Sequence, residues 1–219
     1  MLIEEWDQLQ DMLSEVTLED GRDIVYCALE QSKKYSTGSL YRFITSGGVR
    51  DQQMMNVWKC NIPLKVKIFI WMASHDRIQL GVQLKKKQWS GPEKCAACDV
   101  LETTDHILFQ CPIAVYLWTF LRVTLGWQSS PISCSNFLIE FVDDYRGAKL
   151  KVTLFICAGA LWIIWKTRND MAINKKVLTA PKVIIFKTLM WIKSWRPLLK
   201  VKLEPTAEEM LNLLTANAH

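Results

Sequence analysis

The sequence lacks the features of a secreted, disordered or low-complexity protein. It has only 9 glycines and 7 prolines in 219 residues, and half of its residues are hydrophobic, which excludes disorder along the whole chain. Its first residues, MLIEEWDQLQDML, lack the basic start and apolar run of a signal peptide. We therefore expect an intracellular protein of one ordinary domain or two small ones, in either the nucleus or the cytoplasm.

Long hydrophobic runs are also scarce. The longest, Val152 to Trp165, spans 14 residues between Lys151 and Lys166. A membrane-spanning helix needs about 20 apolar residues. We interpret this run as a buried core helix and expect no membrane insertion.

Motifs of catalysis are missing from the sequence. It has no Y-x-D-D polymerase motif, no G-x-S-x-G nucleophile motif and no series of spaced acids suited to a two-metal nuclease. Two of its three histidines, His75 and His219, have no plausible companion ligands nearby. We expect a protein that is not an enzyme and has no small-molecule substrate.

The cysteines and histidines that are present include one compact group. Residues 95 to 111 read CAACDVLETTDHILFQC, which places Cys95, Cys98, His106 and Cys111 in a C-x2-C-x7-H-x4-C order. Three thiols and one imidazole are a ligand set of structural zinc sites, and four protein ligands leave no open position for water. The alternative is that these are buried thiols and a hydrogen-bonded histidine. The spacing favours a structural Zn²⁺ site.

Charge is distributed unevenly along the chain. The net charge is +5, but residues 1–23 carry a net −7, residues 59–94 a net +6 and residues 145–202 a net +12. An acidic beginning and a basic end suit either a nucleic-acid partner or a protein partner.

Helical spacing of apolar residues dominates the pattern. We expect a mainly α fold, with one short β-hairpin from Ile24 to Ser36, a zinc knuckle, and a helical bundle at the carboxyl end. Residues 1–130 would form the zinc-binding domain with its acidic amino-terminal helix, and residues 131–219 a basic helical region. The expected helices cover 2–15, 39–45, the stretch from Pro63 to His75, 78–87, 113–125, 134–143, 148–173, 181–195 and 206–215.

Three segments around the cysteines carry a family resemblance. These are the segment from Trp58 to Trp71 (WKCNIPLKVKIFIW), the segment from Lys86 to Cys95 (KKQWSGPEKC), and DHILFQCP from Asp105 to Pro112. Together they resemble the zinc-binding domain at the carboxyl end of plant non-LTR (LINE-type) retrotransposon reverse transcriptases. The four proposed ligands fall on the family's cysteine and histidine positions. STGSLYRF and LWIIWKTRND extend the similarity on both sides, although Thr37-Gly38 and Tyr26-Cys27 depart from the family pattern.

The resemblance implies a non-catalytic, retrotransposon-derived module that engages RNA or DNA. Lys85, Lys86, Lys87 and Trp89 offer three cations and one aromatic ring beside the metal loop, which suits phosphates and bases. Alternatively, the lysines are a solvated helix end and Trp89 a core residue. The second hypothesis for function is a domesticated interaction factor that acts, in a regulatory or genetic-conflict role, through a protein partner or its own copies.

Overall fold

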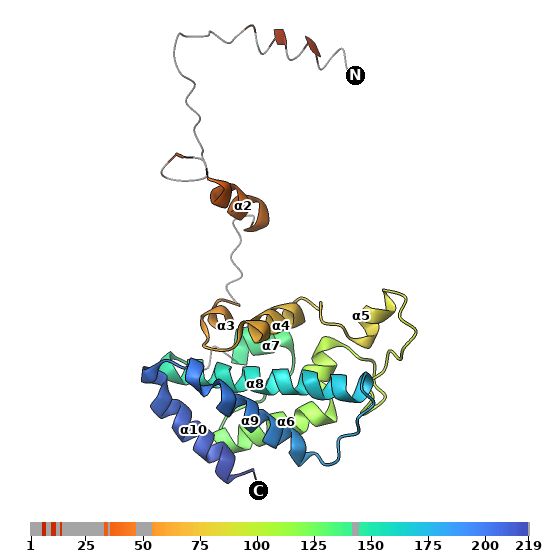
Figure 1. Cartoon of the computed structure of the whole chain (residues 1–219), viewed down its shortest axis with the longest axis vertical. Helices are drawn as coiled ribbons and strands as arrows, with labels where there is room; N and C mark the ends of the chain where they lie inside the picture. Colours follow the sequence, from red (N-terminus) through yellow and green to blue (C-terminus); the bar gives the residue numbers. More distant parts are fainter. Residues whose placement is uncertain are drawn as a thin grey trace. The chain divides into compact units, whose positions relative to one another are not determined.

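The computed structural model in Figure 1 describes residues 6, 7, 10, 11, 14, 33, 34, 36–46, 54–141 and 145–218. The chain divides into two compact units, Met1–Arg50 and Asp51–His219. In the first unit, helix α2 (Thr37–Ser46) confirms the predicted helix at 39–45, and the Ser39 hydroxyl donates a hydrogen bond of 2.7 Å to the Ser36 carbonyl at its start. The predicted helix at 2–15 and hairpin at 24–36 lie largely outside the described residues.

The second unit is built of helices, which confirms the prediction of a mainly α fold. Among the described residues there is no β-strand, only one isolated bridge between Lys94 and Leu101. The α-helices are α3 (Met55–Lys59), α4 (Leu64–Ser74), α5 (Gly81–Lys85), α6 (Pro112–Leu125), α7 (Cys134–Asn136), α8 (Gly147–Ala172), α9 (Lys182–Trp195) and α10 (Glu204–Ala216). The π-helices η1 (His106–Gln110) and η2 (Phe137–Phe141) and the 3-10 turns η3 (Arg196–Leu198) and η4 (Val201–Leu203) complete the unit.

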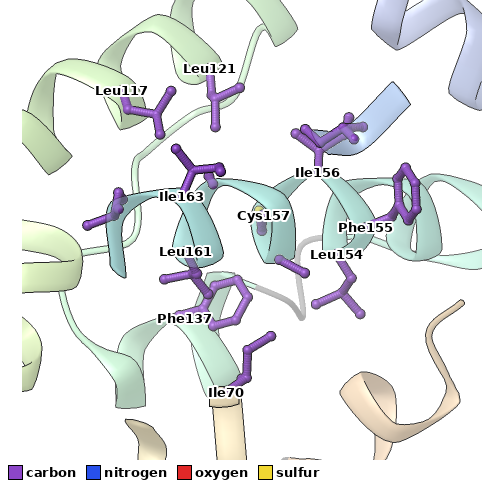
Figure 2. Close-up of a cluster of buried hydrophobic side chains, with 14 of the residues drawn as sticks. Ile70, Leu117, Leu121, Phe137, Leu154, Phe155, Ile156, Cys157, Leu161 and Ile163 are labelled. Atoms are coloured by element: carbon purple, nitrogen blue, oxygen red, sulfur yellow. The ribbon is translucent and has the colours of Figure 1, made fainter. Parts of the chain in front are cut away.

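Helix α8 is the centre of this unit and contacts α4, α6, α9, α10 and η1. Figure 2 shows side chains projecting from it on several sides, toward α6 with Leu117 and Leu121 and toward Ile70 and Phe137. By length and hydropathy α8 could cross a membrane. However, 67% of its most apolar 18-residue stretch is buried inside the unit. A helix that is apolar all round belongs in a core when other helices cover it. The predicted core helix is confirmed.

Two helix boundaries follow from local sequence. Pro112 stands in the first turn of α6, where its missing N–H costs nothing, and Gly126 ends this helix with a φ of 65°. Helix α5 is shorter than the predicted 78–87, because Ile78 and Leu80 are both buried while Leu80 is extended with a ψ of 165°. Residues 78–80 therefore precede the helix, with Ile78 and Leu80 both in the core, and α5 begins only at Gly81.

The α8–α9 packing depends on a close approach at Gly159. A Cβ atom at this position would lie 2.5 Å from Cγ1 of Ile192, a side chain that is fully buried on α9.

The two predicted domains are in contact through α8. The helices α6 and η1, which belong to the predicted first domain, pack against this helix of the predicted second domain. The boundary between residues 130 and 131 stays a prediction.

We expect Gly159→Ala to destabilise the protein by about 1–3 kcal/mol, because the added methyl group overpacks the contact with Ile192. The measurement is urea unfolding of Gly159→Ala, Ile192→Ala and the double variant. The double variant should cost less than the two single variants together, since removing Ile192 side-chain atoms makes room for the methyl group. Strictly additive costs would contradict this close contact.

Candidate metal centre

The first two proposed ligands lie in a tight turn. The amide of Cys95 donates to the carbonyl of Val100 at 2.8 Å, and the amide of Asp99 donates back to the carbonyl of Cys95 at 2.9 Å. Asp99 has a positive φ of 59°, which turns the chain sharply after Cys98. The amide of Ala97 points at the Cys95 sulfur, with a distance of 3.5 Å. This knuckle holds both sulfurs on one side of the loop.

The other two ligands come from the start and end of η1. The amide of His106 donates to the Thr103 hydroxyl at 3.2 Å, which fixes the beginning of η1. The amide of Cys111 donates to the His106 carbonyl at 2.6 Å, and Cys111 then leads into α6. The wide π-turn therefore brings His106 and Cys111 back to the same side.

The four ligand atoms fit a tetrahedral Zn²⁺ site. They all lie within 4.8 Å of one another. The Cys95 and Cys111 sulfurs are 3.8 Å apart, and the Cys98 sulfur is 3.2 Å from Nε2 of His106. In a tetrahedron with Zn–S of about 2.3 Å and Zn–N of about 2.0 Å, the corresponding separations are about 3.8 and 3.5 Å. These four residues would hold the ion, whose chemistry here is to cross-link two loops.

One thiol of this group, that of Cys95, differs from the other cysteines. A hydrogen bond with Cys111 lowers the pKa of Cys95 to about 5, while the same contact raises the pKa of Cys111. Burial instead raises the pKa of Cys60 to about 11 and that of Cys157 as well. Thiolates are the form that binds metal. The site therefore favours a thiolate at Cys95, whereas Cys60 and Cys157 are neutral core residues.

The site is closed on its inner side. Cys95, Cys111 and Ile107 face Ile164 and Thr167 of α8 across a cavity of about 20 Å³. This space holds about one water molecule and no substrate. The arrangement suits a structural ion rather than a hydrolytic one.

A buried ion pair joins the metal loop to α8. Glu102 is 1% exposed, and Arg168 of α8 is 7% exposed. The Arg168 Nε donates to Oε1 of Glu102 at 2.7 Å, and its Nη2 donates to Oε2. The same carboxylate accepts the amide of Gly81 at 2.6 Å, and Nη1 of Arg168 donates to the Gln79 carbonyl at 3.1 Å. The pair thus anchors both the knuckle and the segment before α5.

The Glu102–Arg168 pair was not predicted from spacing and motifs. Arg168 lies inside the LWIIWKTRND segment. Glu102 is one of three acids between Cys98 and His106, the others being Asp99 and Asp105. An arginine in an apolar helix is a signal for a buried partner. The partner's identity depends on tertiary packing across 66 positions.

The proposed nucleic-acid residues lie beside the knuckle. Lys85 ends α5, and Lys86 and Lys87 follow it on the surface. Trp89 is half-buried, and its ring lies directly against Gly91, since a Cβ on Gly91 would be 2.0 Å from the ring. An open groove of about 730 Å³ lies next to them and is lined by Lys85, 91–99 and Leu101. The role of the four residues in binding stays a prediction.

We expect purified protein to contain about one zinc ion per chain. Cys98→Ser or a strong chelator should destabilise it by several kcal/mol, because metal binding contributes directly to folding. Metal analysis and thermal unfolding measure both effects. The control is Cys134→Ser, a thiol outside the ligand group, which should keep its zinc. A metal-free chain with an unchanged melting temperature would contradict the prediction of a zinc site.

We expect Arg168→Met to destabilise the protein by about 3–5 kcal/mol, because it leaves the Glu102 carboxylate buried and unpaired. The double variant Glu102→Gln/Arg168→Met removes the unpaired charge and should recover part of this loss. Chemical unfolding and competition with a chelator measure stability and zinc affinity. Equal stability of Arg168→Met and the parent protein would refute the anchoring role of the pair.

Comparison with known proteins agrees with this geometry. Residues 35–118 match the model of a family described as zinc-binding in reverse transcriptase, and all four ligands lie inside the match. A putative ribonuclease H protein of Arabidopsis thaliana is 24% identical over 156 residues, which cover 68% of this chain and 25% of that protein. No solved structure matches the chain. The resemblance predicted from the sequence is confirmed: residues 35–118 match the zinc-binding domain of reverse transcriptases, and the cofactor of that domain is zinc.

Proposed function

We propose that the chain is a non-catalytic, retrotransposon-derived module, stabilised by zinc, which binds RNA or DNA along the groove beside its knuckle. The observation that carries this proposal is the open groove of about 730 Å³, whose wall holds Lys85 and Lys94 together with Glu93 and Asp99. Lys86 and Lys87, which follow Lys85 in the chain, are exposed. They add the positive charge that attracts a phosphate backbone to this groove.

The lysines of this groove are available to phosphates. Lys85 pairs with Glu93 at 3.6 Å and Lys94 with Asp99 at 2.7 Å, and these side chains are 43–80% exposed. Exposed ion pairs contribute little to stability, so a phosphate can replace either carboxylate at small cost. In the described part of the chain, no carboxylate lies within 4 Å of Lys86 or Lys87.

Trp89 lies next to the groove. Its ring contacts Gly91, and Gly91 lines the groove. The ring is half-buried, and in this proposal its exposed part stacks on a base, while the alternative is that it only packs against the loop.

Several observations support a role without catalysis. The matching family is described by its zinc binding, and four protein side chains are placed to complete the coordination of one ion. Among the described residues, one group of His, Cys, Asp and Glu is placed to hold a metal, and it is the cysteine–histidine group. The relative is named a ribonuclease H protein, but this chain spans about a quarter of its length.

A protein partner is the second candidate, and one surface favours it. Leu64, Ile68 and Trp71 recur along one side of α4 and are 65%, 42% and 37% exposed. An apolar stripe on a helix surface suits a protein contact, including contact with a second copy. Binding through this stripe would be insensitive to salt, unlike binding through the lysines.

Replacing Lys85, Lys86 and Lys87 with Ala should weaken binding to RNA or DNA oligonucleotides and reduce the dependence of affinity on salt, by roughly 0.7–0.9 in slope for each phosphate that is no longer neutralised. Fluorescence anisotropy of labelled oligonucleotides at several salt concentrations measures both quantities. The control is Lys200→Ala/Lys202→Ala, which removes exposed charges near η4. Unchanged affinity of the triple variant would remove these lysines from the function.

A further inference from the structure

A second group of cations and aromatic rings lies where α4, α8 and α9 meet. We call Lys65, Lys166, Trp162 and Trp191 the lysine–tryptophan cluster. The Lys65 ammonium is 5.3 Å from the ring centre of Trp191 and 5.6 Å from that of Trp162. The Lys166 ammonium is 5.1 Å from the ring centre of Trp191. Three separate helices therefore bring two cations to one tryptophan.

The two ammonium groups share one aromatic neighbour and have no acidic partner among the described residues. Each lies within 5.3 Å of the ring centre of Trp191. Within that part of the chain, no carboxylate lies within 4 Å of Lys65 or Lys166. The only acid on α4, α8 and α9 is Asp170, and it pairs with Lys187 at 3.7 Å. Two cations without a carboxylate partner favour the binding of an anion.

The surroundings of the cluster decide the kind of anion. Lys65 and Lys166 are exposed, Trp191 is half-buried, and Met190 beside it on α9 is 60% exposed. Cations are thus placed next to aromatic and apolar surface. A single nucleic-acid strand offers a phosphate together with the flat face of an unstacked base, whereas a duplex keeps its bases stacked and polyglutamate offers carboxylates without aromatic rings.

We infer that the lysine–tryptophan cluster binds single-stranded nucleic acid, with the phosphate backbone held by Lys65 and Lys166 and a base against the aromatic and apolar surface that Trp191 and Met190 expose. This inference rests on the proposed function and adds a second contact surface to it. The knuckle groove is lined by Lys85, residues 91–99 and Leu101, while the cluster is formed by α4, α8 and α9. Three of its four residues, Trp162, Lys166 and Trp191, lie outside the segment that matches the zinc-binding family.

The test uses the full zinc-loaded chain and labelled single-stranded oligonucleotides, with anisotropy measured across a salt series. Lys65→Gln/Lys166→Gln should weaken binding about tenfold and lower the salt slope by roughly 0.7 for each phosphate that the two lysines neutralise on a single strand. Trp191→Leu should also weaken binding about tenfold, because the base no longer has a ring to stack on, but leave the salt slope unchanged. Melting temperatures of all variants separate these effects from loss of folding.

The matched control is Lys200→Gln/Lys202→Gln, which removes the same charge beyond the end of α9 and should keep the parent slope. If Lys65→Gln/Lys166→Gln behaves like this control while Lys85, Lys86 and Lys87 replaced by Ala lose affinity, the cluster inference is overturned and the proposed function stands. If the parent chain binds no oligonucleotide, both fail. Equal affinity for polyglutamate and for the oligonucleotide would overturn the nucleic-acid assignment of the cluster.

Discussion

The burial of the Glu102 carboxylate against the Arg168 guanidinium is the constraint on which this structure depends. A buried charge is costly unless it is paired, so the knuckle loop and α8 must fold together. Zinc fixes the shape of the loop, and the ion pair fixes its place on the central helix. Because the same carboxylate also binds the amide of Gly81, the segment before α5 is held there too, and with it the lysines that follow. Metal, core and basic surface are thus one connected arrangement.

Much of the fold could be predicted from the sequence. The spacing of apolar residues predicts helices at 113–125, 148–173 and 181–195, and the structure has α6, α8 and α9 there with bounds that differ by one residue. The metal ligands were predictable because their spacing is local and their chemistry specific. Helix α3 (Met55–Lys59) and the π-turn of η1 were not predicted. Each of these two elements has 5 residues, and so short a helix has too few apolar positions to show a period.

Features that depend on contacts between distant parts of the chain were beyond such reasoning. The Glu102–Arg168 pair, the approach of α9 to Gly159 and the contacts of Lys65 and Lys166 with Trp191 each join residues far apart in the sequence. Charge counting indicated that residues 145–202 are basic, but only packing brings one of those lysines and a lysine of α4 to the same tryptophan ring. The structure thus places one basic residue of this region, Lys166, on the surface where α4, α8 and α9 meet.

The central claim is a closed zinc site that organises a binding module, and the coordination of the metal tests it most directly. X-ray absorption spectroscopy of the zinc-loaded protein should find three sulfur ligands at about 2.3 Å and one nitrogen at about 2.0–2.1 Å, with no oxygen. These are the sulfurs of Cys95, Cys98 and Cys111 and the Nε2 of His106. A spectrum with two or fewer sulfurs, or with a water ligand, would contradict the closed structural site.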